Sequence, residues 1–370
     1  MAAAACLAAA ACRQEAGHQL PAPARLTNVV VNGMTPVKDQ GSNGNCWAYA
    51  MLAAIETEHL TRGDSVNLSA DYAMRALTEE LFARLYLCQG HTATSLRGMA
   101  QTLLNVMQRK GMMPYDSYRA DPSPNCRTIA RKVGLVARAA AARRTGLERS
   151  MPQVAQLLDD AYGPLPRRVY MLGAEYTPQE FGRSVCAPGE YVALTSYTHH
   201  PFGQPFALEL PDNWEHNEQL NVPLDSLVGV MRRAVAAGRG VCWEGDVSDP
   251  GFSFRRGVAR LRPGTDTSQG ARQRAFERFE TTDDHCMAVV GLARDARGER
   301  YFVMKNSWGT RNPYGGLMYV SEDYVRLRTV AIVVPRALLQ APCAARTGNG
   351  LSGAGGAGAP HLHMAKGMTA

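Results

Sequence analysis

The chain lacks any apolar run of about 18 residues, the length that a membrane-spanning helix needs. It also lacks a Cys-x-x-Cys pair, which argues against zinc-ribbon and thioredoxin-type motifs. Lysine is scarce, with 5 residues against 35 arginines. What is present is a 370-residue chain with 45% hydrophobic residues, enough to bury a large core. The composition predicts one elaborated domain or two lobes, with no transmembrane segment.

The basic excess is concentrated in one stretch, residues 127–149. The net charge of the chain is +7, and this stretch holds seven basic side chains, namely Arg127, Arg131, Lys132, Arg138, Arg143, Arg144 and Arg149. A basic run can bind nucleic acid, but no interleaved aromatic side chains are present for stacking on bases. We therefore expect a solvated helix face and no nucleic-acid partner.

The two ends of the chain differ in composition from the rest. Residues 1–25 begin with an alanine-rich segment that reaches Cys12 and resembles the apolar core of a bacterial lipoprotein signal, without its basic start. This favours the bacterial cell envelope or periplasm, with the cytoplasm as the alternative. Residues 336–370 become rich in Gly and Ala, which predicts a flexible tail.

Hydrophobic periodicity between these ends indicates an α+β protein. Helical spacing occurs in five segments: 46–60, 69–87 capped by Ser69, 95–111 capped by Ser95, 151–162 and 223–238. Short apolar runs typical of strands occur at 26–38, 240–244, 286–293, 300–305, 316–321 and 329–334. Helices dominate the first part and strands the last, so two lobes are expected, with a reaction centre in the cleft between them.

Three short strings carry the chemistry. They are Gln40-Gly-Ser-Asn-Gly-Asn-Cys46-Trp47, then Asp284-His285, then Asn306-Ser307-Trp308. Acyl transfer by a cysteine needs a thiolate, a base, a group that orients the base and a donor for the oxyanion. These strings contain each of those groups, in the order donor, nucleophile, base, orienter.

Each expected role has a physical reason. Cys46 begins a helix, where unpaired N–H groups and the helix dipole favour the thiolate. His285 begins a strand and Asn306 ends its hairpin neighbour, so the amide oxygen can orient the imidazole. Gln40 can direct its side-chain N–H at the oxyanion, beside the backbone N–H of Cys46. Trp308 can shield the His–Asn hydrogen bond from water.

Four further residues are candidates for the substrate cleft: Gly44, Trp47, Asp284 and Trp308. No motif for a metal or an organic cofactor occurs. The adjacent His199 and His200 would point to opposite faces of a strand and so are expected to be structural. Asp283 and Asp284 could tune the histidine or bind a substrate amine, although solvated loop positions are the simpler expectation.

The strings Pro36-Val37-Lys38-Asp39-Gln40-Gly41-Ser42, Gly44-Asn45-Cys46-Trp47 and Asn306-Ser307-Trp308-Gly309 resemble the papain superfamily of cysteine peptidases. Others resemble its bleomycin hydrolase and aminopeptidase C branch, especially the bacterial members: Leu68-Ser69-Ala70-Asp71-Tyr72, Thr198-His199-His200-Pro201-Phe202, Asn221-Val222-Pro223-Leu224-Asp225 and Cys242-Trp243-Glu244-Gly245-Asp246-Val247-Ser248. The resemblance covers roughly residues 26–335.

This resemblance implies a papain-like two-lobe fold. A helical lobe would carry the Cys46 helix, a β-sheet or barrel lobe would carry His285 and Asn306, and a helical insertion would span about 121–240. It implies Cys46 as nucleophile, His285 as acid/base, Asn306 as orienter and Gln40 as oxyanion donor, acting on peptides through a thioester acyl-enzyme. A homo-oligomer is implied by the resemblance alone.

The resemblance favours an aminopeptidase but leaves alternatives open. In bleomycin hydrolases a C-terminal carboxylate in the cleft restricts cleavage to free N-termini, whereas this chain continues for 36 residues beyond Val334. The residues that directly precede Cys46 also resemble the corresponding segment of papain more than that of the bleomycin hydrolase branch. A cysteine endopeptidase or acyl transferase is the first alternative, and an inactive papain-fold binding protein is the second.

Overall fold

The computed structural model describes residues 25–171 and 173–340, and those up to Leu339 belong to one compact unit. The predicted leader, including Cys12, and nearly all of the predicted tail lie outside the described residues. No described helix is long and apolar enough to cross a membrane.

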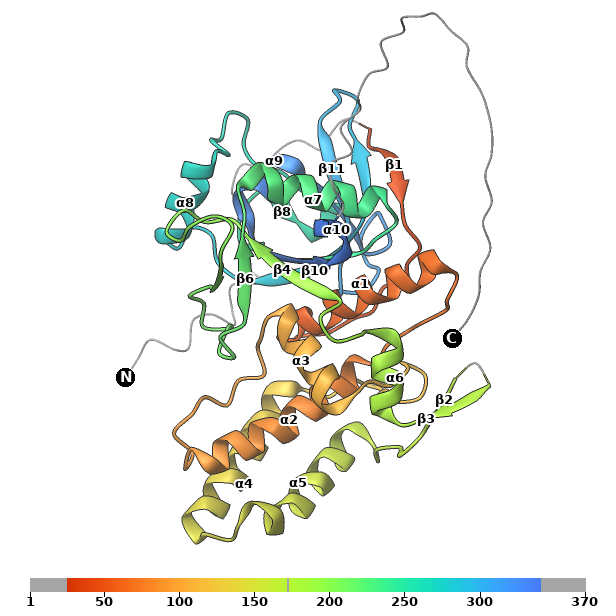
Figure 1. The fold of residues 1–370 in the computed structure, drawn as a ribbon, viewed down its shortest axis with the longest axis vertical. Helices are drawn as coiled ribbons and strands as arrows, with labels where there is room; N and C mark the ends of the chain where they lie inside the picture. Colours follow the sequence, from red (N-terminus) through yellow and green to blue (C-terminus); the bar gives the residue numbers. More distant parts are fainter. Residues whose placement is uncertain (1–24, 172, 341–370) are drawn as a thin grey trace, which may run out of the picture. The chain divides into compact units, whose positions relative to one another are not determined.

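Helices occupy most of the first half of this unit. They are α1 (Cys46–Arg62), α2 (Ala70–Leu87), α3 (Ala100–Lys110), α4 (Cys126–Arg143), α5 (Leu147–Tyr162) and α6 (Pro178–Val185). Figure 1 shows α2, α4 and α5 packed side by side. Their buried faces form one apolar core with α1 and α3. The basic side chains of 127–149 all lie exposed along α4, the turn after it and the start of α5, which confirms the expected solvated face.

The second half is built around a long sheet. Its strands are β1 (Thr27–Val31), β4 (Tyr191–Thr195), β5 (Pro205–Ala207), β6 (Glu218–Asn221), β7 (Val241–Gly245), β8 (Phe252–Ser253), β9 (Val258–Ala259), β10 (His285–Arg294), β11 (Arg300–Lys305), β12 (Leu317–Ser321) and β13 (Thr329–Pro335). The order is β5-β6-β4-β13-β7-β10-β11-β12-β9-β8, and β1 pairs with β10. A separate hairpin joins β2 (Val169–Met171) to β3 (Ala174–Tyr176).

Four more helices belong to this half: α7 (Leu224–Ala236), α8 (Gln269–Glu277), α9 (Glu322–Arg328) and α10 (Ala337–Gln340). Helix α7 packs on the sheet, and a second apolar core lies beneath it (Figure 1). The predicted α+β division into a helical lobe and a sheet lobe is therefore confirmed. The boundaries predicted for the insertion and the leader remain predictions.

Several helix ends follow from local chemistry. Ser69 caps α2 by accepting a hydrogen bond from the Tyr72 N–H, and Gly63 ends α1 with a φ of 91° that favours glycine. The expected Ser95 cap is wrong, because α3 begins at Ala100 after Met99. Ser95 instead accepts from the Arg97 N–H within a loop. A short polar side chain can bond a loop N–H as readily as a helical one, and the sequence does not separate the two cases.

A buried ionic cluster connects α1 to the sheet. Glu56 of α1 is fully buried and accepts hydrogen bonds from Lys38 (2.8 Å), from the backbone N–H of Leu68 (2.8 Å) and from Thr35. Lys305, at the end of β11, lies 3.7 Å from Glu56 and donates to Thr35 at 2.7 Å. Burial lowers the pKa of Lys305 to about 8. One carboxylate thus neutralises two basic side chains where the helical lobe meets the sheet lobe.

Candidate active site

Cys46 is the first residue of α1, and its side chain is half-buried. The preceding Asn45 makes no capping hydrogen bond with its side chain, and no acidic residue occupies the first turn. The Ala48 N–H donates to the Asn45 carbonyl at 3.0 Å, so it is the earlier N–H groups, those of Cys46 and Trp47, that the helix start can offer to a ligand. Gly41 has a φ of 61°, the left-handed region, and turns the preceding loop back toward this helix end.

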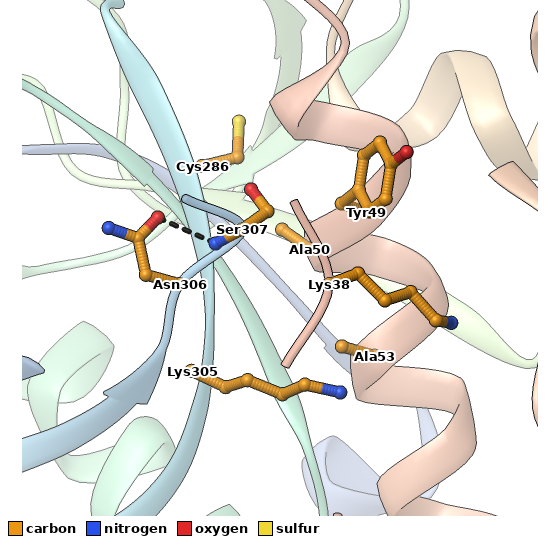
Figure 2. A pocket seen from close by; sticks show the side chains of 8 residues that line it. All are labelled: Lys38, Tyr49, Ala50, Ala53, Cys286, Lys305, Asn306 and Ser307. Atoms are coloured by element: carbon orange, nitrogen blue, oxygen red, sulfur yellow. Dashed lines mark hydrogen bonds between the residues drawn. The ribbon is translucent and has the colours of Figure 1, made fainter. Parts of the chain in front are cut away.

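His285 and Asn306 meet at the end of the β10–β11 hairpin. The His285 Nε2 lies 2.7 Å from the Asn306 Oδ1. The same oxygen accepts a hydrogen bond from the Ser307 N–H at 2.7 Å, which Figure 2 shows as a dashed line. Because an amide oxygen can only accept, Nε2 carries the proton and Nδ1 faces the cysteine. Trp308 lies over the imidazole with ring centroids 4.4 Å apart, in the shielding position expected from the sequence.

The Cys46 sulfur is held in an environment that favours its ionised form. Its pKa lies well below the usual value because the Cys286 thiol donates a hydrogen bond to it. A hydrogen bond from His285 and the charge of that imidazole act in the same direction, while burial opposes them. This environment favours the thiolate form of Cys46, the form in which a cysteine acts as a nucleophile.

Gln40 connects the loop before α1 to the opposite lobe. Its Oε1 accepts from Ser307 Oγ at 2.6 Å, and its backbone N–H donates to the Ser307 carbonyl at 2.8 Å. Its Nε2 donates to the Asn43 carbonyl at 2.5 Å. An amide nitrogen has two hydrogens, so this bond is compatible with the oxyanion-donor role that the sequence predicts for Gln40.

The structure places the four residues predicted to line the substrate cleft in different environments. Gly44 is exposed, and a Cβ there would lie 3.3 Å from the Arg97 side chain. Asp284 and Trp308 are half-buried near His285. The placement of Trp47 in the cleft is wrong: its side chain is 1% exposed and lies within the helical core. At the second position of α1 it points under the helix, away from any substrate.

Several residues at the site were not expected from the sequence. Antiparallel pairing places Glu244 of β7 opposite Cys286 of β10. Arg97, from the loop before α3, donates to the Asp283 carbonyl at 3.0 Å and pairs with Asp212 at 2.6 Å. In the sequence, the position of Cys286 directly after His285 was a signal that this residue belongs to the site. The pairing of β7 with β10 was needed to show that Glu244 lies opposite it.

The carboxyl groups near Cys46 are at least partly shielded from water. Burial, as the largest cause, raises the pKa of Asp283 well above its usual value and that of Glu244 to about 7. Repulsion between these acids, and between them and the thiolate, adds to the effect. Burial also raises the pKa of Asp284. The expectation that Asp283 and Asp284 are simple solvated loop residues is therefore wrong, because both are half-buried.

The described residues include one group of three side chains of the kinds that ligate metals. These are His199, His200 and Glu209, whose ligand atoms lie within 4.8 Å of one another. The two histidines occupy a turn, so both rings can reach Glu209, contrary to the strand-based expectation. Gln273 Nε2 donates to the His199 Nδ1, which leaves the proton on Nε2, where it donates to Glu209. This network provides no free ring lone pair for a cation at His199.

Comparison with known proteins agrees with this geometry. The family described as papain family cysteine protease matches residues 24–165. PepW from Lactobacillus rhamnosis has a similar structure, with 15% identity, a TM-score of 0.68, and coverage of 84% of this chain and 82% of PepW.

More distant structural matches include procathepsin L 3 of the Tenebrio molitor larval midgut, with 16% identity and a TM-score of 0.41 over 86% of this chain and 73% of that one. Bromelain from Ananas comosus matches with 13% identity and a TM-score of 0.38 over 82% of this chain and 93% of that one. Residues 24–165 thus match the papain family of cysteine proteases, and the likeness to PepW shows that this chain has the same fold as that protein.

Proposed function

We propose that the chain is an aminopeptidase that acts through Cys46, His285 and Asn306. The Cys46 thiolate attacks the carbonyl carbon of the substrate's first peptide bond, and the oxyanion is received by Gln40 and the backbone N–H of Cys46. The His285 imidazolium protonates the leaving amine, which yields a thioester. Water activated by the neutral imidazole then hydrolyses the thioester and regenerates the thiolate.

The Cys–His–Asn arrangement is the observation that supports this mechanism most directly. The 2.7 Å contact between His285 and Asn306 fixes the tautomer that the reaction needs. The lowered pKa of Cys46 favours the ionised form of the nucleophile. An inactive binding protein of the same fold would not require these groups together.

Preference for a free N-terminus is supported by the acids beside the nucleophile. Asp283 and Glu244 lie close enough to Cys46 for their charges to interact with it, and the pKa of each is raised by burial and by repulsion from Cys46 and Asp212. A protonated substrate amine placed among them would relieve this repulsion. A blocked N-terminus offers no such charge, so it would leave the acids uncompensated.

The test compares an aminoacyl fluorogenic amide with its N-acetylated counterpart, each with and without iodoacetamide. We expect the free amine to be preferred in kcat/KM by at least about tenfold, with all turnover lost after alkylation. Asp283→Asn should narrow the preference for the free amine over the acetylated substrate, because an amide cannot ionise to pair with the substrate's ammonium group. Equal or better turnover of the acetylated substrate would indicate an endopeptidase, and no thiol-sensitive turnover of either would indicate a binding protein.

Asn306→Ala should cause a partial loss of activity. The imidazole would lose the acceptor that orients it, but nucleophile and base would remain, so we expect kcat/KM to fall by about 10- to 100-fold. Asn306→Asp is the informative companion, because it keeps an acceptor at the same place and should retain more activity than alanine. An alanine variant with wild-type kcat/KM would contradict the orienting role.

A further inference from the structure

One loop of the sheet lobe crosses to the helical lobe near the active site. It comprises residues 208–217, between β5 and β6. Its Trp214 packs against the apolar core of the helical lobe, and the guanidinium of Arg84 on α2 lies 3.8 Å from the centre of the Trp214 ring. Arg109 of α3 donates to Glu215 of the loop at 3.1 Å. The loop is therefore anchored on α2 and α3, although the strands on either side of it belong to the sheet.

A buried asparagine fixes the shape of this loop. Asn213 is 3% exposed, and its side chain donates to the carbonyls of Leu208 and Asn217, both at 3.0 Å. Its Oδ1 accepts from the Asn217 N–H at 2.9 Å. The two ends of the loop are thus tied to one side chain, so the loop has a defined shape before any substrate binds.

Arg97 joins this loop to both lobes. Its Nε donates to the Asp212 Oδ2 at 2.7 Å, and its Nη2 donates to the Asp283 carbonyl at 3.0 Å. Its own carbonyl accepts from the Trp214 Nε1 at 2.9 Å. The stem of the side chain passes Gly44, where an added Cβ would lie 3.3 Å from the Arg97 Cγ. Arg97 and Asp212, here called the crossbar, therefore extend from the loop before α1 to the strand that follows Asp283.

The crossbar lies close to both catalytic residues. Gly44 is two residues before Cys46, and Asp283 is two residues before His285. Two residues of chain span at most about 7 Å, so Arg97 contacts each lobe within about that distance of the nucleophile or the base. An extended substrate advances about 3.3 Å with each residue. A substrate that runs toward Asp283 would therefore meet the crossbar within about two residues of the scissile bond.

We infer that the crossbar closes the end of the site that receives the substrate's N-terminus, and so limits the enzyme to releasing single residues. This inference rests on the proposed function, which places the substrate's ammonium group on the Asp283 side of Cys46. A longer N-terminal segment would have to displace the Arg97 guanidinium from Asp212 and from the Asp283 carbonyl. The exclusion is steric, which distinguishes it from recognition of the amine by its charge.

The first test measures which reagent reaches the Cys46 sulfur, and it needs no turnover. Full-length protein is alkylated with leucyl or alanyl-alanyl-leucyl chloromethyl ketone, both with free N-termini, and mass spectrometry follows each Cys46 adduct. Each rate is divided by the iodoacetamide rate of the same variant, which removes changes in thiolate reactivity. Wild type should favour the one-residue reagent by at least about tenfold, and Arg97→Ala should narrow that ratio by at least about fivefold.

Three further variants assign the effect to the crossbar. Arg97→Lys keeps the positive charge but loses the planar fork that bonds two acceptors, so its ratio should lie between those of wild type and Arg97→Ala. Asp212→Asn, which keeps the size of the side chain, should shift the ratio in the same direction by a smaller factor. Arg131→Ala, the same change as in Arg97→Ala at an exposed position on α4, should keep the wild-type ratio.

The second test identifies the products cut from a pentapeptide with a free N-terminus. At early times wild type should release its first residue alone, whereas Arg97→Ala should also release dipeptides and tripeptides from the same end. Equal alkylation by the two reagents in wild type, or an unchanged ratio in Arg97→Ala, would overturn the inference. Neither result would touch the preference for a free amine, since both reagents carry one. Equal turnover of the acetylated and free aminoacyl amides would count against the proposed function instead.

Discussion

Replacing Cys46 by serine is expected to lower kcat/KM for peptide amides by at least about 10⁴-fold. The serine hydroxyl has nearly the same shape, but its pKa is far higher, so the interactions that ionise a thiol do not ionise it. The hydrogen bond from Cys286 and the imidazolium of His285 would then stabilise a charge that never forms. Turnover of the fluorogenic aminoacyl amide, followed at high enzyme concentration, measures the loss.

The matched control is Cys88→Ser, the same chemical change at an exposed position on the end of α2. It should keep wild-type kcat/KM and wild-type thermal unfolding. The Cys46→Ser protein should also unfold at a temperature close to that of wild type, because Cys46 is half-buried and the substitution is nearly isosteric. Undiminished activity in Cys46→Ser would falsify the assignment of the nucleophile.

Replacing Glu56 by glutamine should cause the largest loss of stability. The amide keeps the size of the carboxylate and one acceptor but removes the charge that Lys38 and Lys305 share. Removing one partner of a buried ion pair typically costs about 3–5 kcal/mol, because the remaining charge is uncompensated. We expect the free energy of unfolding in urea to fall by an amount of this order.

The control for Glu56 is Glu280→Gln, an identical change at an exposed position. Surface substitutions of this kind usually lie within about 0.5 kcal/mol of wild type. A Glu56→Gln protein as stable as the control would mean that Lys305 simply becomes neutral, which its pKa of about 8 brings within reach, and that the cluster contributes little.

Much of the fold could be predicted from the sequence because its signals are local. The helix beginning at Cys46 has apolar residues at helical spacing and a glycine just past its end, and the structure has it there. The hairpin of β10 and β11 was similarly predicted from two apolar runs around a turn. Strands β4 to β6 and helices α8 and α9 were missed, since they are short and lack a clear hydrophobic period.

The sequence by itself determined the chemical groups: a cysteine at a helix start, a histidine and an asparagine at the ends of paired strands, and a glutamine before the helix. Each of these groups is recognised from residues only a few positions away, and such local patterns are visible in the sequence alone. Only the tertiary structure decided what surrounds the sulfur. The placement of Cys286 opposite Glu244 results from strand pairing, and the raised pKa of Asp283 results from desolvation by segments remote in the chain; neither effect leaves a local pattern in the sequence.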